Sequence, residues 1–512
     1  MKTILASVSD KTGLVELLQA FQAVEPLRII ATGSTAKHLE TAGLTVETVE
    51  SITGFPEILE GRVKTLHPIV FGGILAKDSP EHEMDLRAHG IPRIDVVIVN
   101  LYPFEQTIQH GASESVTVEN IDIGGVALIR AAAKNFQHVA VLCDPTNYST
   151  VAEELKASQG QLSLSFRKML AQKAFEHTAR YDSLIATYFM KQITHETPPA
   201  FLPLSFEKIE DLRYGENPHE KAAWYGQVGR FYKPFEQLQG KQMSANNLVD
   251  AYAATKILQE FPGDPVCCII KHNNPCGVAV GSSVDDAYQK AYDSDPVSAF
   301  GGIFGFNRSV TKLIAEKISG LFVEIVLAPD FDADALEVLS QKKNVRVLKV
   351  PMLSKPVTKK SAWMLKDLED FGVLMQEKSL SNTLPELSTV TQLPLPENTL
   401  ADVAFAWGVV KHLTSNAICI VKNGRTIGYG IGQTSRIASM EIALRQASQE
   451  AQGAVLASDG FFPATDNIEA AAKAGICVIV QPGGSIKDPE VIEAANHHGL
   501  AMVMTHERCF KH

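Results

Sequence analysis

Short apolar runs alternate with helix-like patterns in the first part of the chain, and this alternation restricts the possible folds more than any other feature. The runs with the length and the Val, Ile and Leu content of buried strands are residues 4–8, 27–31, 95–99 and 139–142. Between the first two runs, residues 14–21 place their apolar side chains on one helix face. Strands that alternate with helices predict a parallel α/β domain over residues 1 to about 145.

The chain is too long for one hydrophobic core, so we expect several compact units. A helix running to about residue 195 is predicted next, with core positions at Phe166, Leu170, Ala174, Phe175 and Thr178. The Pro-rich stretch 197–203 then reads as a linker, and it divides the 512 residues into domains 1–196 and 197–512. Stretches rich in Pro, Ser and Thr at residues 350–362 and 379–400 are predicted as connectors.

Composition excludes several classes of function. A hydrophobic content of 45% and a charged content of 21% are typical of a soluble globular protein, and the net charge of -11 argues against a nucleic acid partner. The 7 cysteines are odd in number and scattered through apolar runs, which indicates reduced thiols and no disulfide framework. No segment reaches membrane-spanning length and no signal peptide precedes the first strand, so we expect a cytoplasmic protein without a membrane partner.

Two successive predicted strands end in Ser, Thr, Gly and Lys before a helix begins, at residues 9–13 and 32–37. Free backbone N–H groups and the positive end of a helix dipole suit such a place to a phosphate group. Capping of a helix by Ser or Thr explains either loop alone about as well, but two adjacent loops with matching lysines favour an anion site. The GxxxxGK[ST] loop is absent, so hydrolysis of a nucleoside triphosphate is not predicted.

Lys271 and His272 follow directly on the buried-strand pattern of residues 266–270. We expect Asn274, Pro275 and Gly277 to turn the chain away at once. An imidazole at a strand end suits a general base, whereas the alternative is a polar turn whose side chains bond only to nearby backbone. A second Lys-His pair at residues 411–412, again after an apolar run, suggests an internal duplication.

Other motifs of catalysis or cofactor binding are incomplete or missing. Residues 428–433 resemble a dinucleotide-binding loop but lack its last Gly. Pro275 and Cys276 could begin a deaminase zinc motif, but Ala279 stands where the second Cys is needed. The HExxH, Cys-x-x-Cys and GxSxG patterns are absent. We therefore expect chemistry by side chains alone, with no metal.

Ten short motifs follow one another along the chain. They are SVSDKTG at residues 7–13, GRVKTLHP at 61–68, NLYPF at 100–104, DIGG at 122–125, AAAKN at 131–135, LRYGENPH at 212–219, KHNNPCG at 271–277, DPVSAFGG at 295–302, SNA at 415–417 and GQTSR at 432–436. Together they resemble, over essentially the whole chain, the bifunctional purine-biosynthesis proteins that combine phosphoribosylaminoimidazolecarboxamide formyltransferase with IMP cyclohydrolase.

The resemblance implies a fold for each half. Residues 1–196 are expected to form a methylglyoxal-synthase-like parallel α/β domain that carries the cyclohydrolase. Residues 197–512 are expected to carry the formyltransferase on two tandem cytidine-deaminase-like α/β subdomains without zinc, roughly 204–365 and 366–512. The resemblance also implies a homodimer with the formyltransferase sites at its interface.

The reaction implied by the resemblance has two steps. A formyl group passes from 10-formyltetrahydrofolate, a co-substrate, to the 5-amino group of the imidazole carboxamide nucleotide AICAR, and the product FAICAR then closes to IMP with loss of water. No tightly bound cofactor is expected. For transfer, the resemblance implies that His272 transfers the proton, that Lys271 gives electrostatic support and that Asn416 positions the formyl oxygen. For cyclisation, Asp122 and Lys134 are expected to move protons, with orientation and oxyanion support from Lys64 and Tyr102.

Substrate contacts are also implied by the resemblance. Those for the 5′-phosphate are Ser7, Ser9, Lys11, Thr12, Gly33, Ser34 and Thr35, and nucleotide contacts in the second half are Arg213, Tyr214, Gly215 and Arg508. Further substrate contacts are Arg62, Thr65, Asn100, Gly124, Gly125, Asn246, Phe300, Gly301, Gln433 and Arg436, and the folate side is placed near Phe461, Pro463, Asn467 and Pro482. The chain departs from residues frequent in the family at Glu220, Ala245, Ala438, Ala464 and Cys509.

Two alternatives stay open at this point. One is a phosphate-sensing regulatory protein that has lost catalysis, which could dispense with Lys271, His272 and Asn416. The other keeps only the transferase, and cyclisation then occurs elsewhere. The presence of both implied catalytic sets favours the bifunctional enzyme.

Overall fold

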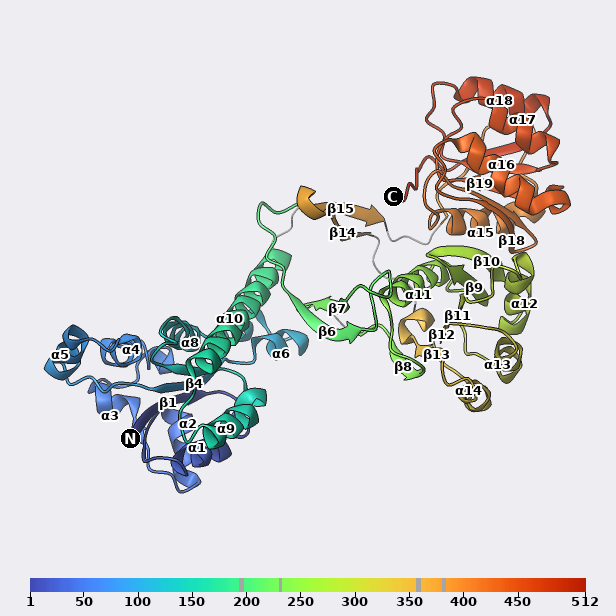
Figure 1. Ribbon diagram of the computed structural model, residues 1–512. Coiled ribbons are helices and arrows are strands. Elements are labelled where there is room, and N and C mark those ends of the chain that lie inside the picture. The colour runs from blue at the N-terminus through green and yellow to red at the C-terminus, as the bar shows by residue number, and fades with distance from the viewer. Residues whose placement is uncertain (193–197, 230–232, 356–360, 380–383) are drawn as a thin grey trace. The chain divides into compact units, whose positions relative to one another are not determined.

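The computed structural model describes residues 1–192, 198–229, 233–355, 361–379 and 384–512 (Figure 1). The chain separates into two compact units, of which the first is Met1–Glu207 with Gly226–Phe231 and the second is Lys208–Tyr225 with Tyr232–His512. The boundary predicted at residues 196/197 lies outside the described residues. The two-stranded sheet of β6 (Phe206–Leu212) and β7 (Ala222–Gln227) contains the residues at which the units divide.

The first unit is built on a parallel sheet, as predicted. Its strand order is β3-β2-β1-β4-β5, and every neighbouring pair is parallel. The strands are β1 (Lys2–Val8), β2 (Leu27–Ala31), β3 (Glu47–Thr48), β4 (Val96–Asn100) and β5 (Ala140–Leu142). β4 is buried along its whole length because helices cover both faces of such a sheet. The carboxyl ends of β1, β2 and β4 therefore lie at one edge of the sheet.

Helices surround this sheet (Figure 1). They are α1 (Leu14–Gln22), α2 (Gly33–Thr41), α3 (Val49–Thr53), α4 (Pro68–Leu75), α5 (Pro80–Ala88), α6 (Phe104–Gln109), α7 (Glu114–Glu119), α8 (Gly124–Lys134), α9 (Tyr148–Ala157) and α10 (Leu164–Gln192). The predicted apolar face of α1 is buried, and so are Leu170, Ala174 and Thr178 of α10. Phe175 is a correction: it is 40% exposed, and the Arg130 guanidinium lies 5.5 Å from its ring centroid.

The second unit has one mixed sheet of twelve strands among its described residues, in the order β16-β21-β20-β19-β17-β18-β10-β9-β11-β12-β13-β8. The strands and helices of its first part are β8 (Glu236–Gln239), α11 (Ala245–Leu258), β9 (Val266–Lys271), β10 (Asn274–Val280), α12 (Val284–Ser294), β11 (Ile303–Phe306), α13 (Lys312–Ser319), β12 (Ile325–Ala328), α14 (Ala333–Ser340) and β13 (Arg346–Lys349). Those of its last part are β16 (Ser388–Thr389), α15 (Leu400–Val410), β17 (Ile418–Lys422), β18 (Arg425–Gly430), α16 (Arg436–Ala447), β19 (Val455–Ser458), α17 (Asp466–Lys473), β20 (Val478–Gln481), α18 (Asp488–His497) and β21 (Ala501–Met504).

The element order of α11–β13 is repeated in α15–β21, which supports the predicted duplication. In each repeat a helix leads into an antiparallel hairpin, and two further parallel strands follow the third strand. In both repeats the hairpin lies very close to the helix that follows it. A Cβ at Gly277 would lie 2.0 Å from the Ala291 carbonyl oxygen, and a Cβ at Gly428 would lie 2.2 Å from the Ala443 carbonyl oxygen. Each position therefore requires Gly.

The two Lys-His pairs, however, are not equivalent in the repeats, and that part of the prediction is wrong. Lys271 is the last residue of strand β9 and His272 follows it. Lys411 and His412 instead follow helix α15, and both contact the Glu260 carboxylate, at 2.6 and 2.9 Å. The place of His272 in the second repeat is taken by the β17–β18 turn at Asn423 and Gly424.

The turn after β9 also differs from the prediction. His272 and Asn273 make the turn, with φ of 54° and 62°, and Asn274 already belongs to β10. Pro275 lies within β10, where the register with β9 shifts between Pro275 and Gly277. A bulged position tolerates Pro because no ladder hydrogen bond is needed from it.

Antiparallel β10 and β18 join the two repeats, with Ala279 opposite Arg425. The start of β10 and the end of β18 therefore lie at the same edge of the sheet. The His272 turn precedes the start of β10, and the end of β18 pairs with the start of β17, which Asn416 precedes. One edge of the sheet thus collects polar residues of both repeats.

The hairpin of β14 (Ser361–Asp367) and β15 (Val373–Ser379) is a separate two-stranded sheet. It lies between the two predicted connectors, 350–362 and 379–400, and overlaps them only at its ends. Residues 356–360 and 380–383 of those connectors lie outside the described residues. All seven cysteines are free.

Candidate active sites

In the first unit, the carboxyl edge of β1, β2 and β4 brings together the predicted phosphate loops. The buried Asn100 side chain holds the loop after β1, since its Oδ1 accepts from the N–H groups of Ser9 (2.7 Å) and Asp10 (2.9 Å). Its Nδ2 donates to the Asp10 carbonyl at 2.7 Å. Asn100 thus acts on the loop, and its carboxamide is largely occupied by backbone groups.

The hydroxyls at this edge divide into internal and outward groups. Thr35 is 1% exposed, and its Oγ1 bonds to the N–H and carbonyl of Val8 at 3.1 and 3.2 Å, so it supports the loop and does not face a ligand. Thr32 Oγ1 donates to Ser7 Oγ at 3.0 Å. Gly33 and Ser34 are exposed at the start of α2, where free N–H groups and the helix dipole favour an anion.

Lys11 and Thr12 complete this loop. The Thr12 hydroxyl and N–H both donate to Asp10 Oδ1, at 2.7 and 2.9 Å, and these bonds lower the pKa of Asp10. Lys11 Nζ donates to the Ser9 carbonyl at 3.3 Å. The Lys11 ammonium thus lies over its own loop, which the bonds between Val8 and Thr35 join to the start of α2.

A second cluster in this unit surrounds Asp122. Burial raises the pKa of this carboxyl, while the N–H groups of Gly125 and Tyr102 and the Lys64 ammonium partly oppose the rise. Gly125 N donates to Asp122 Oδ1 at 2.6 Å. A Cβ added at Gly124 would lie 3.1 Å from Thr65 Oγ1, so the start of α8 lies against the loop of Lys64 and Thr65. The structure brings these predicted residues together, and Tyr102 is 41% exposed beside them.

Two residues of this cluster were not identified in the sequence. Glu57 pairs with Lys64, at 3.2 Å between Oε1 and Nζ. Tyr181 of α10 accepts from the N–H of Asp122 at 2.8 Å and donates to the Asn120 carbonyl at 2.9 Å. Tyr181 carries no local signal because it is 59 positions from Asp122, and Glu57 lies just outside the motif of residues 61–68.

Lys134 is not brought to this cluster. It is exposed at the last turn of α8, whose first residue is Gly124. At about 1.5 Å of rise per residue, the two ends of α8 are ~15 Å apart. Asp122 and Lys134 of one chain therefore do not meet. Arg62 is exposed and pairs with Glu119.

In the second unit, Lys271 and His272 lie at the sheet edge shared by the repeats. Lys271 Nζ donates to the carbonyl of Phe300 at 2.8 Å, which brings residues 300–301 to the end of β9. The His272 side chain is exposed beside this contact. Asp250 of α11, which the sequence did not single out, accepts from the N–H of Asn273 at 2.5 Å.

The predicted nucleotide loop at residues 213–217 docks on the start of the same helix. The N–H of Ala245 donates to the Tyr214 carbonyl at 3.1 Å, and Asn246 Nδ2 donates to the Glu216 carbonyl at 2.9 Å. Arg213 lies with its guanidinium 5.5 Å from the ring centroid of Tyr214. Helix α11 thus positions both the nucleotide loop and the His272 turn.

The second repeat contributes Asn416 to this edge of the sheet. Its Oδ1 accepts from Arg436 Nη2 at 2.6 Å, and its Nδ2 donates to the Gln433 carbonyl at 2.9 Å. Arg436 is buried and pairs with the fully buried Asp459 at 2.5 Å. Arg436 therefore orients Asn416 from inside the protein, and one N–H of the Asn416 amide stays available for a ligand.

The predicted folate-side residues follow the ends of the parallel strands of this repeat. Phe461 and Pro463 are exposed after β19, Pro482 follows β20, and Arg508 follows β21. The Arg508 guanidinium lies 4.4 Å from the ring centroid of Phe510. Asn467 is buried, and its Oδ1 has no hydrogen-bond partner. Carboxyl ends of parallel strands are the usual ligand-binding edge of an α/β sheet.

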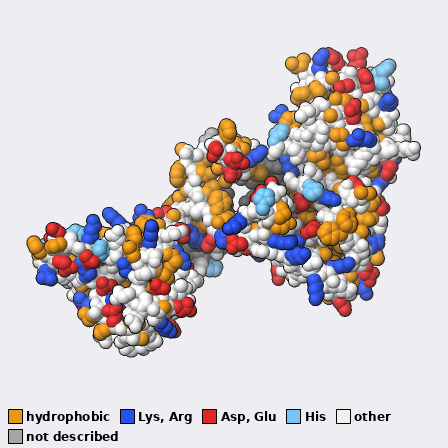
Figure 2. All heavy atoms as spheres, viewed as in Figure 1, with side chains coloured by type: hydrophobic (Ala, Val, Ile, Leu, Met, Phe, Trp, Pro, Cys, Tyr) orange, Lys and Arg blue, Asp and Glu red, His pale blue; other side chains and the backbone are white. Residues whose placement is uncertain are grey.

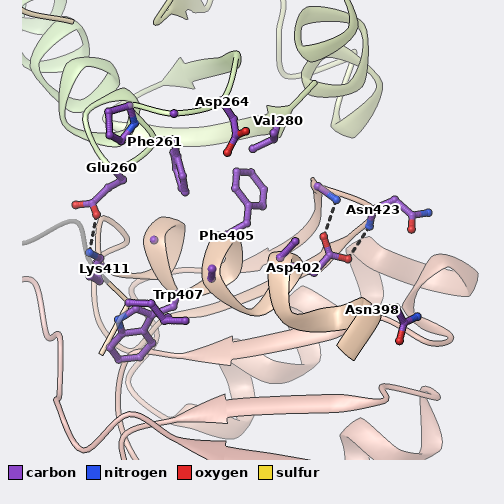
Figure 3. A pocket seen from close by; sticks show the side chains of 17 residues that line it. Glu260, Phe261, Asp264, Val280, Asn398, Asp402, Phe405, Trp407, Lys411 and Asn423 are labelled. Atoms are coloured by element: carbon purple, nitrogen blue, oxygen red, sulfur yellow. Dashed lines mark hydrogen bonds and ion pairs between the residues drawn. The ribbon is translucent and has the colours of Figure 1, made fainter. Parts of the chain in front are cut away.

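Among the described residues, no group of three or more His, Cys, Asp or Glu side chains could hold a metal ion. A cavity of about 500 Å³ lies between the repeats, lined in part by Asp264, Val280, Asn423 and Gly424 (Figure 3). These residues mark the sheet edge opposite to His272, so the cavity contains none of the predicted site residues.

Comparison with known proteins agrees with this arrangement. A family model described as "AICARFT/IMPCHase bienzyme" matches residues 132–446, and one described as "MGS-like domain" matches residues 13–127. Proteins named "Bifunctional purine biosynthesis protein PurH" from Acetivibrio thermocellus and Ruminiclostridium cellulolyticum are 48% and 47% identical over 517 residues, covering 100% of each chain. The chain belongs to the AICARFT/IMPCHase bienzyme family.

As a member of this family, the chain is a bifunctional enzyme with formyltransferase and IMP cyclohydrolase activities, which catalyse the last two steps of IMP synthesis. The alternatives of a non-catalytic phosphate sensor and of a single-activity transferase are thereby overturned. A relative of the same name from Oceanobacillus iheyensis is 44% identical over 516 residues and also covers 100% of both chains. Of the helices that the structure describes, none combines the length and the apolar character needed to cross a membrane.

Proposed function

We propose that the family's two activities reside at separate sites, cyclisation at the Asp122 cluster and formyl transfer at the sheet edge of His272 and Asn416. The observation that carries this proposal is the presence of two unlike polar clusters, each within its own compact unit. Each cluster lies where strand ends expose polar groups, and each has the chemistry that one of the reactions requires.

Formyl transfer requires a base and an oxyanion donor. The 5-amino nitrogen of AICAR attacks the formyl carbon of 10-formyltetrahydrofolate, the co-substrate. The new C–N bond forms, the bond from the formyl carbon to N10 of the folate breaks, and the proton lost by the amine passes through His272 to N10. The exposed imidazole of His272 suits this transfer. The remaining N–H of Asn416 supports the developing oxyanion, with Lys271 nearby as a positive charge.

Arg213, Tyr214, Gly215 and Asn246 are proposed to hold the nucleotide, because α11 places their loop and the His272 turn on one support. Phe300 and Gly301 lie against Lys271 on the same edge. Arg508, Phe461, Pro463, Asn467 and Pro482 stay proposed ligand contacts, and Gln433 and Arg436 are proposed to act by orienting Asn416.

Cyclisation requires attack of the carboxamide nitrogen of FAICAR on its formyl carbon, followed by loss of water. Asp122 suits proton movement because burial raises the pKa of its carboxyl. Lys64 and Tyr102 are proposed to orient the substrate and to support the oxyanion. The loops of Ser7–Thr12 and Gly33–Thr35 are proposed to bind the 5′-phosphate, with Ser9, Lys11, Gly33 and Ser34 closest to it and Asn100 and Thr35 as supports.

We also propose a homodimer, on the basis of the β14–β15 hairpin. An isolated two-stranded hairpin is marginal in water, yet Phe371 is 95% and Val373 61% exposed on it. Figure 2 shows hydrophobic atoms over this segment. A second copy that covers the hairpin accounts for these side chains. Lys134 stays a proposed proton-transfer residue, although it lies at the far end of α8 from Asp122. The seven free cysteines support the cytoplasm as the compartment.

The test measures both activities in the same purified protein. Wild-type protein supplied with AICAR and 10-formyltetrahydrofolate is expected to form IMP. His272→Ala is expected to abolish formyl transfer while FAICAR still closes to IMP, and Lys64→Ala is expected to do the reverse. A single substitution that abolishes both activities in a folded protein contradicts the assignment of two sites.

A further inference from the structure

The His272 turn has a backbone conformation that its residues do not favour. Both turn residues have positive φ, which in a two-residue hairpin is readily adopted by Asn followed by Gly. His at the first position and a non-Gly residue at the second are costly there, and such strain persists only where surrounding contacts enforce it. The contacts that enforce it are therefore part of how His272 is presented.

Two side chains hold the turn. Asn274 Nδ2 donates to the His272 carbonyl at 3.0 Å, and Asp250 Oδ1 accepts from the N–H of Asn273 at 2.5 Å. Asp250 is half-buried on α11, and it lies close enough to His272 for their charges to interact. The carboxylate thus connects α11, which also holds the nucleotide loop, to the peptide that follows His272.

The second repeat contains the same contact without the strain. Asp402 of α15 accepts from the N–H groups of Asn423 and Gly424, at 2.8 and 2.7 Å, at the β17–β18 turn (Figure 3). There the turn residues are Asn and Gly, with φ of 54° and 69°, the pair that this turn favours. The carboxylate on the preceding helix is thus a feature of the fold, and only in the first repeat does it hold a strained turn with an imidazole.

We propose that Asp250 is a positioning residue for formyl transfer, which holds the His272–Asn273 turn so that the imidazole faces the nucleotide bound at the α11 loop. The inference rests on the proposed role of His272 in proton transfer. Asp250 does not touch the substrate; it fixes the distance between the base and the nucleotide loop. Misplacement of a catalytic group by about 1 Å can cost a hundredfold in rate.

The test compares Asp250→Ala, Asp250→Asn and the matched control Asp402→Ala. Formyl transfer is measured as kcat and as KM for AICAR, and closure of supplied FAICAR is the internal control. Asp250→Ala is expected to lower kcat of transfer by about tenfold to a hundredfold, with KM changed by no more than about threefold. Asp250→Asn retains an oxygen that accepts from Asn273, so it is expected to restore kcat to within about threefold of wild type.

Asp402→Ala removes the same kind of bond from the other repeat, so it is expected to lower thermal stability as Asp250→Ala does and to leave kcat of transfer near wild type. Should Asp250→Ala not fold, Asp250→Ser replaces it, because its hydroxyl is too short to reach Asn273. The proposal is overturned if Asp250→Ala keeps the wild-type kcat while His272→Ala is inactive, or if Asp250→Asn is as slow as Asp250→Ala. Full transfer by His272→Ala would instead overturn the proposed function.

Discussion

The hydroxyl of Tyr181 and the backbone N–H of Asp122 are joined by a hydrogen bond of 2.8 Å, although the two residues are 59 positions apart in the chain. The same hydroxyl donates to the Asn120 carbonyl, so one side chain of α10 satisfies both backbone groups that flank residue 121. Tyr181 is buried, and its ring packs edge-on against Phe104 at 6.0 Å between centroids. The loop that presents the Asp122 carboxyl is thus anchored from a helix that contributes no predicted catalytic group.

Tyr181→Phe is expected to slow FAICAR closure by about tenfold and to leave formyl transfer unchanged. Two part-buried backbone groups lose their partner, which costs about 1–3 kcal/mol in free energy of unfolding. Urea denaturation and the two activity assays check both effects. The matched control is Tyr188→Phe on the same helix, since the Tyr188 ring also packs on Phe104 at 5.7 Å. Equal loss of closure in both variants would show that the bonds from the Tyr181 hydroxyl to the Asp122 loop are not responsible.

Asp122→Asn is expected to remove FAICAR closure and to stabilise the protein at neutral pH. The pKa of Asp122 is raised in the folded state, so its contribution to stability is fully present below the ordinary value of 3.8 and is lost as pH rises through the raised pKa. Asn avoids this loss and keeps an acceptor for Gly125. The difference in free energy of unfolding between variant and wild type should therefore grow from acidic to neutral pH.

Asp10→Asn is the comparison variant, because the pKa of Asp10 is shifted in the opposite direction to that of Asp122. Hydrogen bonds from Thr12 lower the pKa of Asp10, so the stability it contributes is present above its ordinary value and is lost as pH falls through the lowered pKa. This variant is expected to be less stable than wild type at neutral pH, with the difference vanishing in acid. Parallel pH profiles for the two variants would contradict the burial of Asp122.

Arg436→Met is expected to destabilise the protein by about 3–5 kcal/mol, because it leaves the buried Asp459 carboxylate unpaired. It also frees the Asn416 carboxamide, so formyl transfer should fall by at least about tenfold in whatever fraction stays folded. Chemical denaturation and single-turnover transfer measure the two effects. Arg508→Met is the control: its guanidinium is exposed over Phe510, so stability should change little. A stable, fully active Arg436→Met protein would contradict the orienting role.

The paired change Phe371→Asp and Val373→Asp is expected to weaken a homodimer by at least about tenfold in Kd, because charges replace the apolar side chains proposed to be covered. Sedimentation at several concentrations measures the change. Ile486→Asp is the control, since Ile486 is 98% exposed but is not on the hairpin. A wild-type protein that stays monomeric at all concentrations, or an unchanged Kd in the paired variant, would exclude the hairpin as the contact.

Local patterns predicted the elements of the first unit well, since a buried parallel strand such as β4 and an amphipathic helix such as α1 both have distinct periodicities. They misplaced the turn after β9 because Asn274 and Pro275 form a turn signal in isolation. Ladder pairing with β9 and the bond from Asn273 to Asp250 determine the actual position. The local signal therefore placed the turn two residues too late in the chain.

The same limit applies to the sites. The motifs named Lys64, Asp122, Lys271 and Asn416. They did not name Tyr181, Asp250 and Asp459, which support the sites across long sequence separations. Glu57 was missed because it lies just outside a motif. The resemblance assigned Asp122 and Lys134 to proton movement in the same reaction. The length of α8 keeps the two side chains of one chain apart. A role inferred from a motif therefore has to be checked against the distance that the intervening helix sets between the residues.

The antiparallel join of β10 and β18 gives the second unit an approximate twofold relation between its halves. This relation matches the edge of His272 and Asn416 with the opposite edge of Asn423 and Asp264. That opposite edge lines the cavity of about 500 Å³ (Figure 3). Duplication thus created two equivalent places, and only one of them received the imidazole. The proposed transfer groups come from both halves, so neither half alone holds the complete proposed set.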